Sequence, residues 1–102
     1  MTKILTKTVS LDNIEYIIQT ECDEHSLWLK IFVYTSYNEF EFKDEIFNRD
    51  INVDLEKDTC EVKWFDNDKN LVIFGALRQE ADNLAKETFI LLKRVKKMKA
   101  FL

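Results

Sequence analysis

Residues 14–34 read IEYIIQTECDEHSLWLKIFVY, and this stretch decides the fold. From Ile14 to Cys22 the even positions are apolar or small, whereas Glu15 and Gln19 lie among the odd positions. A period of two is typical of a strand with one buried face. From Leu27 to Tyr34 both faces are apolar, which predicts an interior strand that is covered on each side.

The period of two continues outward in both directions. Breaks rich in Asp, Asn and Ser separate the alternating runs, and these residues form turns well because they tolerate left-handed dihedral angles. We therefore predict about seven strands, near residues 3–10, 14–22, 26–35, 39–43, 51–57, 59–66 and 70–77. Such short connections favour antiparallel neighbours. Residues Lys43 to Asn48 fit a strand least well and are also compatible with a helical turn.

The period changes after Gly75, the single glycine, which we interpret as a bulge or a close backbone approach at the end of a strand. From about residue 79 to 99 apolar residues recur every three or four positions, which predicts an amphipathic C-terminal helix. The fold class is therefore α+β, an antiparallel sheet or partly closed barrel packed against one helix. This element order is similar to that of pleckstrin-homology-like barrels, and a curved open sheet around the helix fits the same pattern.

The chain has 102 residues, 12.2 kDa, and should form one domain over residues 1–102, with the strands near 3–77 and the helix near 79–99. At this mass, folding buries roughly two-thirds of the surface of the unfolded chain. The apolar runs Ile31–Tyr34 and Phe89–Leu92 are far shorter than the roughly 18 residues of a membrane span. The N-terminus lacks the apolar segment of a secretory signal. We expect a cytoplasmic protein.

Motifs for metal binding and catalysis are incomplete in this sequence. Cys22 and His25 have a C-x-x-H spacing and Cys60 could be a third zinc ligand, but a fourth is missing. Both cysteines alternate with apolar residues, so we interpret them as core residues. Residues 66–70, DNDKN, open like a calcium loop but lack its later Gly and Glu. We therefore expect no catalytic residues, no metal and no cofactor.

Charge is distributed unevenly along the chain. Residues 39–68 hold eleven Asp or Glu and four Lys or Arg, whereas residues 86–99 hold six Lys or Arg and one Glu. The acidic middle predicts a face that binds another protein, in particular a basic one. We assign five residues to this acidic face: Glu39, Glu41, Asn52, Asp54 and Glu56. The most concrete hypothesis is an inhibitor or immunity-type protein of bacterial or phage kind.

The basic end of the chain supports an alternative hypothesis. Five cations of the predicted helix could bind nucleic acid or an anionic lipid headgroup: Lys93, Arg94, Lys96, Lys97 and Lys99. Nucleic acid is the weaker of our expectations because the whole chain has a net charge of -4. The helical spacing is also compatible with a homodimer formed through this helix.

Overall fold

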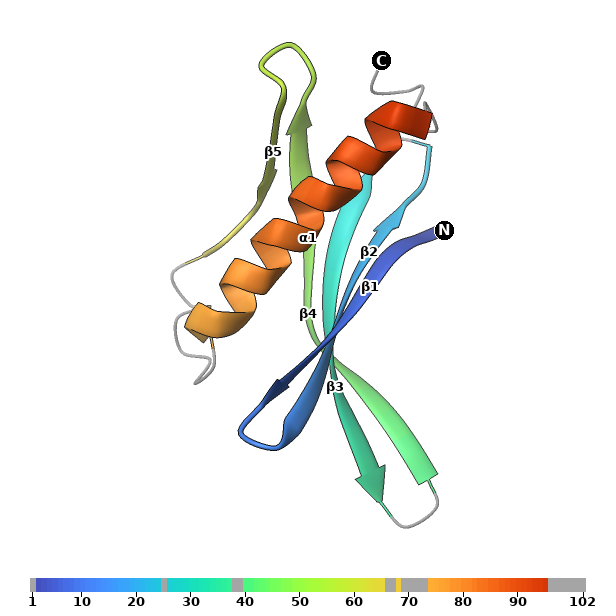
Figure 1. The fold of residues 1–102 in the computed structure, drawn as a ribbon, viewed down its shortest axis with the longest axis vertical. Helices are drawn as coiled ribbons and strands as arrows, with labels where there is room; N and C mark the ends of the chain where they lie inside the picture. Colours follow the sequence, from blue (N-terminus) through green and yellow to red (C-terminus); the bar gives the residue numbers. More distant parts are fainter. Residues whose placement is uncertain (1, 25, 38–39, 66–67, 69–73, 96–102) are drawn as a thin grey trace.

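A computed structural model describes residues 2–24, 26–37, 40–65, 68 and 74–95 (Figure 1). It contains five strands and one helix: β1 (Thr2–Leu11), β2 (Ile14–Cys22), β3 (Leu27–Tyr37), β4 (Phe40–Asp54), β5 (Thr59–Val62) and α1 (Phe74–Val95). The strands form one antiparallel sheet in the order β1-β2-β3-β4-β5. The fold is therefore α+β, a curled open sheet with one helix, as the sequence predicts.

Turns are formed by Asp and Asn, as predicted. Asp12 and Asn13, between β1 and β2, have φ angles of 51° and 65°, and Asp58 before β5 has a φ of 55°. These two side chain types adopt the left-handed region at little cost because their short polar side chains bond to the local backbone. In the turn before β3, the Asp23 carboxylate accepts a hydrogen bond from the Ser26 backbone N–H at 2.7 Å.

The prediction of about seven strands is wrong, because two predicted strands belong to one long strand. β4 includes both the predicted 39–43 strand and most of the predicted 51–57 strand, and the segment Lys43 to Asn48 between them is also strand. A bulge breaks the regular pattern there: Ile31 pairs with Phe47 and Phe32 with Glu45, so Ile46 is an extra residue. The bulge shifts the alternation by one position. The alternation of apolar and polar residues is therefore interrupted in the sequence, although the strand itself continues.

The predicted strand at 70–77 is also wrong over its described part. The helix begins at Phe74, and residues 70–73 lie outside the described part of the chain. Leu77 is 3% exposed and continues the helical spacing of Ala81 and Leu84 toward the N-terminus. Gly75 lies in the first turn of α1 rather than at a bulge, and a Cβ added there would meet nothing within 4 Å.

Replacing Gly75 with alanine should raise the free energy of unfolding by about 0.5 kcal/mol, because glycine is a poor helix former and nothing obstructs a methyl group here. Urea denaturation of the two proteins measures the difference. A lower stability of Gly75→Ala would contradict the placement of this residue in the helix.

The sheet curls around one face of α1, and the helix packs against β5, β2 and β1 (Figure 1). The core is made by apolar residues of both layers, among them Ile18, Leu27, Leu29, Ala81 and Leu84. The predicted apolar stripe of the helix is confirmed in its first turns, where Ala81 and Leu84 are buried. Leu92 is 2% exposed and joins the core, whereas Leu91, which has the same three-four spacing, is 36% exposed.

Over the described residues, no helix covers the other face of the sheet. The prediction that β3 is covered on both sides is therefore wrong: Trp28, Phe32 and Tyr34 are only partly buried. Polar groups of β2 and β3 bond to one another on this face, where the Lys30 Nζ lies 2.9 Å from a Glu21 oxygen. The hydrogen bond with Glu21 raises the pKa of Lys30.

A chain of hydrogen bonds links β1, β2 and α1 through the core. The Leu5 N–H donates to Thr20 Oγ1 at 3.2 Å, and Thr88 Oγ1 donates to the Leu84 carbonyl at 2.8 Å. Thr20 Oγ1 and Thr88 Oγ1 are 2.8 Å apart, and both residues are 0% exposed. Since each hydroxyl has one hydrogen, and that of Thr88 goes to Leu84, Thr20 must donate to Thr88. The N–H of Leu5 and the hydroxyls of Thr20 and Thr88 therefore each donate one hydrogen bond.

The two threonines should therefore be energetically coupled. Thr20→Val orphans the Leu5 N–H and should lower the free energy of unfolding by about 1–3 kcal/mol, and Thr88→Val should cost about 1–2 kcal/mol by orphaning the Thr20 hydroxyl. The double variant should cost less than the sum, because each single substitution already breaks the shared bond. A double-mutant cycle by urea denaturation measures this, and strict additivity would contradict the shared hydrogen bond.

Candidate functional site

The acidic face predicted from the sequence is divided by the fold. The backbone of Glu41 lies near the start of β4, whereas Asp54 is its last residue, and Glu56 follows in the turn before β5. At about 3.3 Å per residue, Glu41 and Asp54 are about 40 Å apart along the strand. Glu39 lies outside the described residues. The structure therefore brings together only Asn52, Asp54 and Glu56.

These three residues lie at one end of the molecule. Asn52 and Glu56 are exposed, while Asp54 is partly buried and its carboxylate accepts a hydrogen bond from the Lys57 backbone N–H at 3.1 Å. Such a bond is typical of an Asp that shapes a turn. Asp54 thus has a structural use in addition to its charge.

The basic helix is described only in part. Lys93 lies 2.5 Å from an Asp58 carboxylate oxygen, with its Nζ 4.4 Å from the centre of the Phe89 ring. Arg94 is exposed. Lys96, Lys97 and Lys99 lie outside the described residues. The apolar stripe of α1 packs on the sheet of its own chain, so this face is already occupied.

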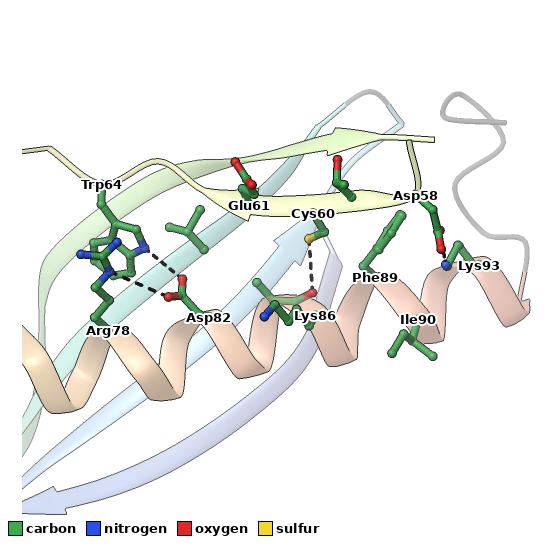
Figure 2. Close-up of a pocket in the computed structure, with 13 residues that line it drawn as sticks. Asp58, Cys60, Glu61, Trp64, Arg78, Asp82, Lys86, Phe89, Ile90 and Lys93 are labelled. Carbon is green, nitrogen blue, oxygen red and sulfur yellow. Dashed lines mark hydrogen bonds and ion pairs between the residues drawn. The ribbon is translucent and has the colours of Figure 1, made fainter. Parts of the chain in front are cut away.

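A groove of about 650 Å³ lies between β5 and α1 (Figure 2). Its strand side includes Cys60, Val62 and, just after β5, Trp64. Its helix side includes Asp82, Lys86 and Phe89. Binding pockets commonly have volumes of about 300–1,000 Å³, so this groove has the size of a binding site.

Three contacts hold β5 and its flanks beside the helix. Near one end of the groove, the Trp64 indole N–H donates to an Asp82 oxygen at 2.9 Å. In the middle, Cys60 Sγ lies 3.6 Å from the Ala85 carbonyl oxygen. Near the other end stands the ion pair between Asp58 and Lys93 (Figure 2). Because these contacts are spread along the groove, they hold its two walls at a fixed separation.

Among the described strands, β5 is the last in the sheet and pairs with β4 alone, which leaves its outer edge without a partner strand. The Lys63 N–H points toward β4, where it donates to the Asp50 carbonyl at 3.4 Å. Since successive backbone groups of a strand point to opposite sides, those of Cys60 and Val62 point away from β4. No described residue forms a backbone hydrogen bond with them.

Charges in the groove are balanced but not all paired. Asp58 pairs with Lys93, and Asp82 accepts the Trp64 N–H and lies 3.9 Å from the Arg78 guanidinium. Lys86 is exposed and forms no hydrogen bond or ion pair with any described residue. Lys86 is therefore the cation of the groove that is open to an external anion.

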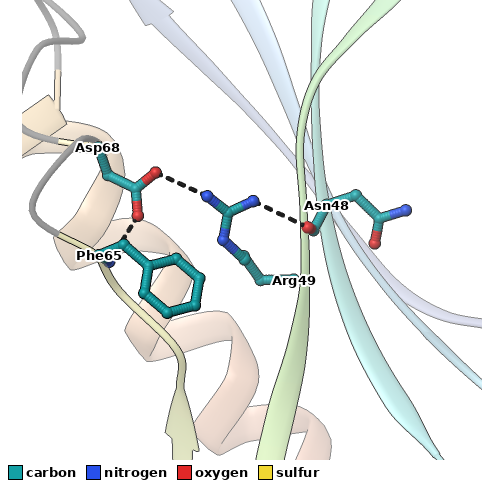
Figure 3. A network of polar contacts seen from close by, with 4 residues as sticks. All are labelled: Asn48, Arg49, Phe65 and Asp68. Carbon is teal, nitrogen blue, oxygen red and sulfur yellow. Dashed lines mark hydrogen bonds and ion pairs between the residues drawn. The ribbon is translucent and has the colours of Figure 1, made fainter.

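Trp64, which lines one end of the groove, belongs to a stack of side chains. Trp64 stacks on Phe47 with ring centres 4.9 Å apart, and the Arg49 guanidinium lies 4.7 Å from the Phe47 centre and 4.9 Å from the Phe65 centre. Arg49 also donates to Asp68 at 2.9 Å, and the other Asp68 oxygen accepts the Phe65 N–H at 2.8 Å (Figure 3). The stack and the carboxylate hold Trp64, Phe65 and Asp68, which follow β5, against β4.

The candidate metal ligands do not form a site over the described part of the chain. Cys22 and Cys60 are both buried free thiols, and no group of three or more potential ligands occurs among the described residues. His25 lies outside these residues, as does most of the calcium-like segment, whose Asp68 bonds to Arg49 instead.

Burial raises the pKa of the Cys60 thiol to about 11. At pH 8 only about one thiol in a thousand is then ionised, so we expect iodoacetamide to label Cys60 at least about 100-fold more slowly in the folded protein than in urea. Because the folded pKa is raised, the stability gained from the protonated thiol is present below pH 9 and lost as the pH rises toward 11. Peptide-level mass spectrometry distinguishes labelling of Cys60 from labelling of Cys22. If Cys60 were labelled at the same rate in the folded protein as in urea, the burial of its thiol would be contradicted.

The sequence analysis does not predict the groove, although the residues of α1 that line it follow a recognisable spacing. Arg78, Asp82, Lys86, Phe89 and Lys93 follow one another at spacings of three and four, beside the apolar stripe. This spacing places them on one side of the helix. Nothing in the sequence indicates that β5 lies next to this side, since that depends on how the sheet curls.

In the described part of the chain, no helix is long and apolar enough to cross a membrane. Comparison of the chain with protein-family models, with curated proteins and with solved structures gave no match.

Proposed function

We propose that this chain is a non-catalytic protein-binding domain, and that its partner occupies the groove between β5 and α1. The observation that carries the proposal is the outer edge of β5 beside this groove, where backbone groups of Cys60 and Val62 face no strand of the described chain. An exposed edge is a template for pairing with another chain.

The chemistry of the groove favours binding over catalysis. Cys60 is the one thiol that lines it, and a pKa of about 11 keeps this thiol protonated and a poor nucleophile. Asp82 is engaged by Trp64 and Arg78. Apolar Phe89 and Ile90 stand beside charged groups, a mixture that is common in protein interfaces.

An inhibitor or immunity-type role is the specific form that we propose. Asp58 lines the groove, and the exposed Glu56 lies two residues before it in the turn between β4 and β5. Negative charge at this end would steer a basic partner toward the groove. This role rests on the charge and on the size of the chain.

The test compares two neighbouring exposed apolar residues of α1. Ile90 lines the groove and is 46% exposed, whereas Leu91 is 36% exposed and does not line it. Affinity capture from the native host with mass spectrometry should identify a partner that binds the wild-type chain and Leu91→Glu. Binding to Ile90→Glu should be at least about tenfold weaker, because a charged side chain would replace an apolar contact and lose its water on binding.

Circular dichroism and urea denaturation of both variants provide the folding control. If Ile90→Glu retains the partner as well as Leu91→Glu does, the groove is not the binding surface.

A further inference from the structure

We propose that the occupant of the groove is an extended segment of the partner, which adds a strand to β5 and places one carboxylate on Lys86. This inference rests on the proposed function and specifies how the partner is recognised.

The edge of β5 provides the backbone half of this recognition. The outward N–H and C=O groups of Cys60 and Val62 lie two residues apart, the spacing at which an added strand forms its hydrogen bonds. Main-chain bonds of this kind supply affinity when a peptide extends a sheet, and side chain pockets supply specificity. The four residues of β5 span about 13 Å, enough to pair with a segment of four or five residues.

The side of α1 that lines the groove provides the side-chain contacts of this recognition. Alternate side chains of an added strand would point toward α1, at intervals of about 6.6 Å. Lys86 and Ile90 are one helical turn apart, about 6 Å along the axis, so successive inward side chains would meet one and then the other. The segment should therefore have an Asp or Glu two residues from an apolar side chain.

Charge complementarity indicates that the partner's side chain facing Lys86 is a carboxylate rather than a cation. Three acidic residues line the groove: Asp58, Glu61 and Asp82. Asp82 and Asp58 are already engaged, by Trp64 and by Lys93, and the exposed Glu61 side chain points away from α1 (Figure 2). Lys86 stands between these two closed contacts with no anionic partner among the described residues (Figure 2). A carboxylate would complete the pairing across the groove, whereas a second cation would be repelled.

The first experiment selects ligands from a display library of random twelve-residue linear peptides. Peptides enriched on the wild-type chain should carry an Asp or Glu two residues from an apolar residue. Lys86→Glu should reverse the preference to Lys or Arg and weaken the wild-type peptides at least about tenfold, since a like charge then faces the carboxylate. Lys63→Glu is the matched control, because Lys63 is an exposed lysine of the same region outside the groove.

The second experiment scans one enriched peptide with backbone N-methylation, one position at a time. N-methylation removes a hydrogen-bond donor, so binding should fall at least about tenfold at alternate positions, those that face β5, and little at the positions between them. A flat profile would overturn strand addition, and absence of any acidic preference would overturn the role of Lys86.

The outcomes separate this inference from the proposed function. Peptides that lose binding to Ile90→Glu but give a flat N-methyl profile would leave the groove as the binding surface and overturn the strand. Peptides that bind Ile90→Glu as well as the wild type would overturn both. Sedimentation equilibrium of the free chain completes the test, because a dimer that Lys86→Glu and Ile90→Glu dissociate would show a second copy as the occupant instead.

Discussion

Replacing Trp64 with alanine should lower the free energy of unfolding by about 3 kcal/mol, the lower part of the range for a truncated aromatic core residue. Trp64 is only partly exposed, stacks on Phe47, and bonds through its indole N–H to Asp82. The substitution removes the ring from the core and one of the contacts that hold α1 beside β5. Urea denaturation followed by circular dichroism measures the loss.

Trp64→Phe separates the two contributions of this side chain. It keeps an aromatic ring on Phe47 and removes the hydrogen bond to Asp82, so it should cost only about 1 kcal/mol. If Trp64→Ala were as stable as Trp64→Phe, the ring would not contribute to packing as described.

Replacing Arg49 with methionine should lower the free energy of unfolding by about 2–3 kcal/mol, because it leaves a buried carboxylate without its cation. Asp68 is 6% exposed, and its remaining bond is to the Phe65 N–H. The Arg49 side chain is 29% exposed, so the expected cost is below that of a fully buried pair. Chemical denaturation at neutral pH provides the measurement.

The double variant Arg49→Met with Asp68→Asn identifies the cause of this loss. Asparagine keeps an oxygen for the Phe65 N–H and has no charge, so the second substitution should recover part of the stability lost by the first. Arg94→Met, at an exposed cation of α1, should change the stability by less than about 0.5 kcal/mol. A double variant less stable than Arg49→Met would show that the charge of Asp68 is not the source of the cost.

The local pattern of the sequence was sufficient to predict the class of the fold. The alternation from Ile14 to Cys22 predicts β2, the Asp and Asn breaks predict the turns, and the three-four spacing after Leu77 predicts α1. Each of these signals comes from neighbouring residues. The strand and the helix are confirmed, as are the turns at Asp12, Asn13 and Asp58, whereas the predicted break at residues 48–50 lies within β4. The number of strands was wrong because a bulge at Ile46 interrupts the alternation without ending β4.

The candidate site could be predicted only in part, because it depends on long-range geometry. Glu41 and Asp54 belong to the same acidic stretch of the sequence, yet they lie at opposite ends of the long strand β4. Conversely, Cys60 and Lys86 are 26 positions apart in the sequence and line the same groove because the sheet curls toward α1. Composition detects the charges, whereas only the fold shows which of them are already paired.

Amide hydrogen exchange at β5 tests the central claim most directly. Exchange of the Cys60, Glu61 and Val62 amides would be followed by NMR for the free chain and with a saturating peptide from the display selection. Cys60 and Val62 face the open edge, so we expect their exchange to slow at least about tenfold, while the Glu61 amide, which faces β4, changes little. Unchanged exchange at both Cys60 and Val62 in the complex would contradict pairing of the partner with this edge.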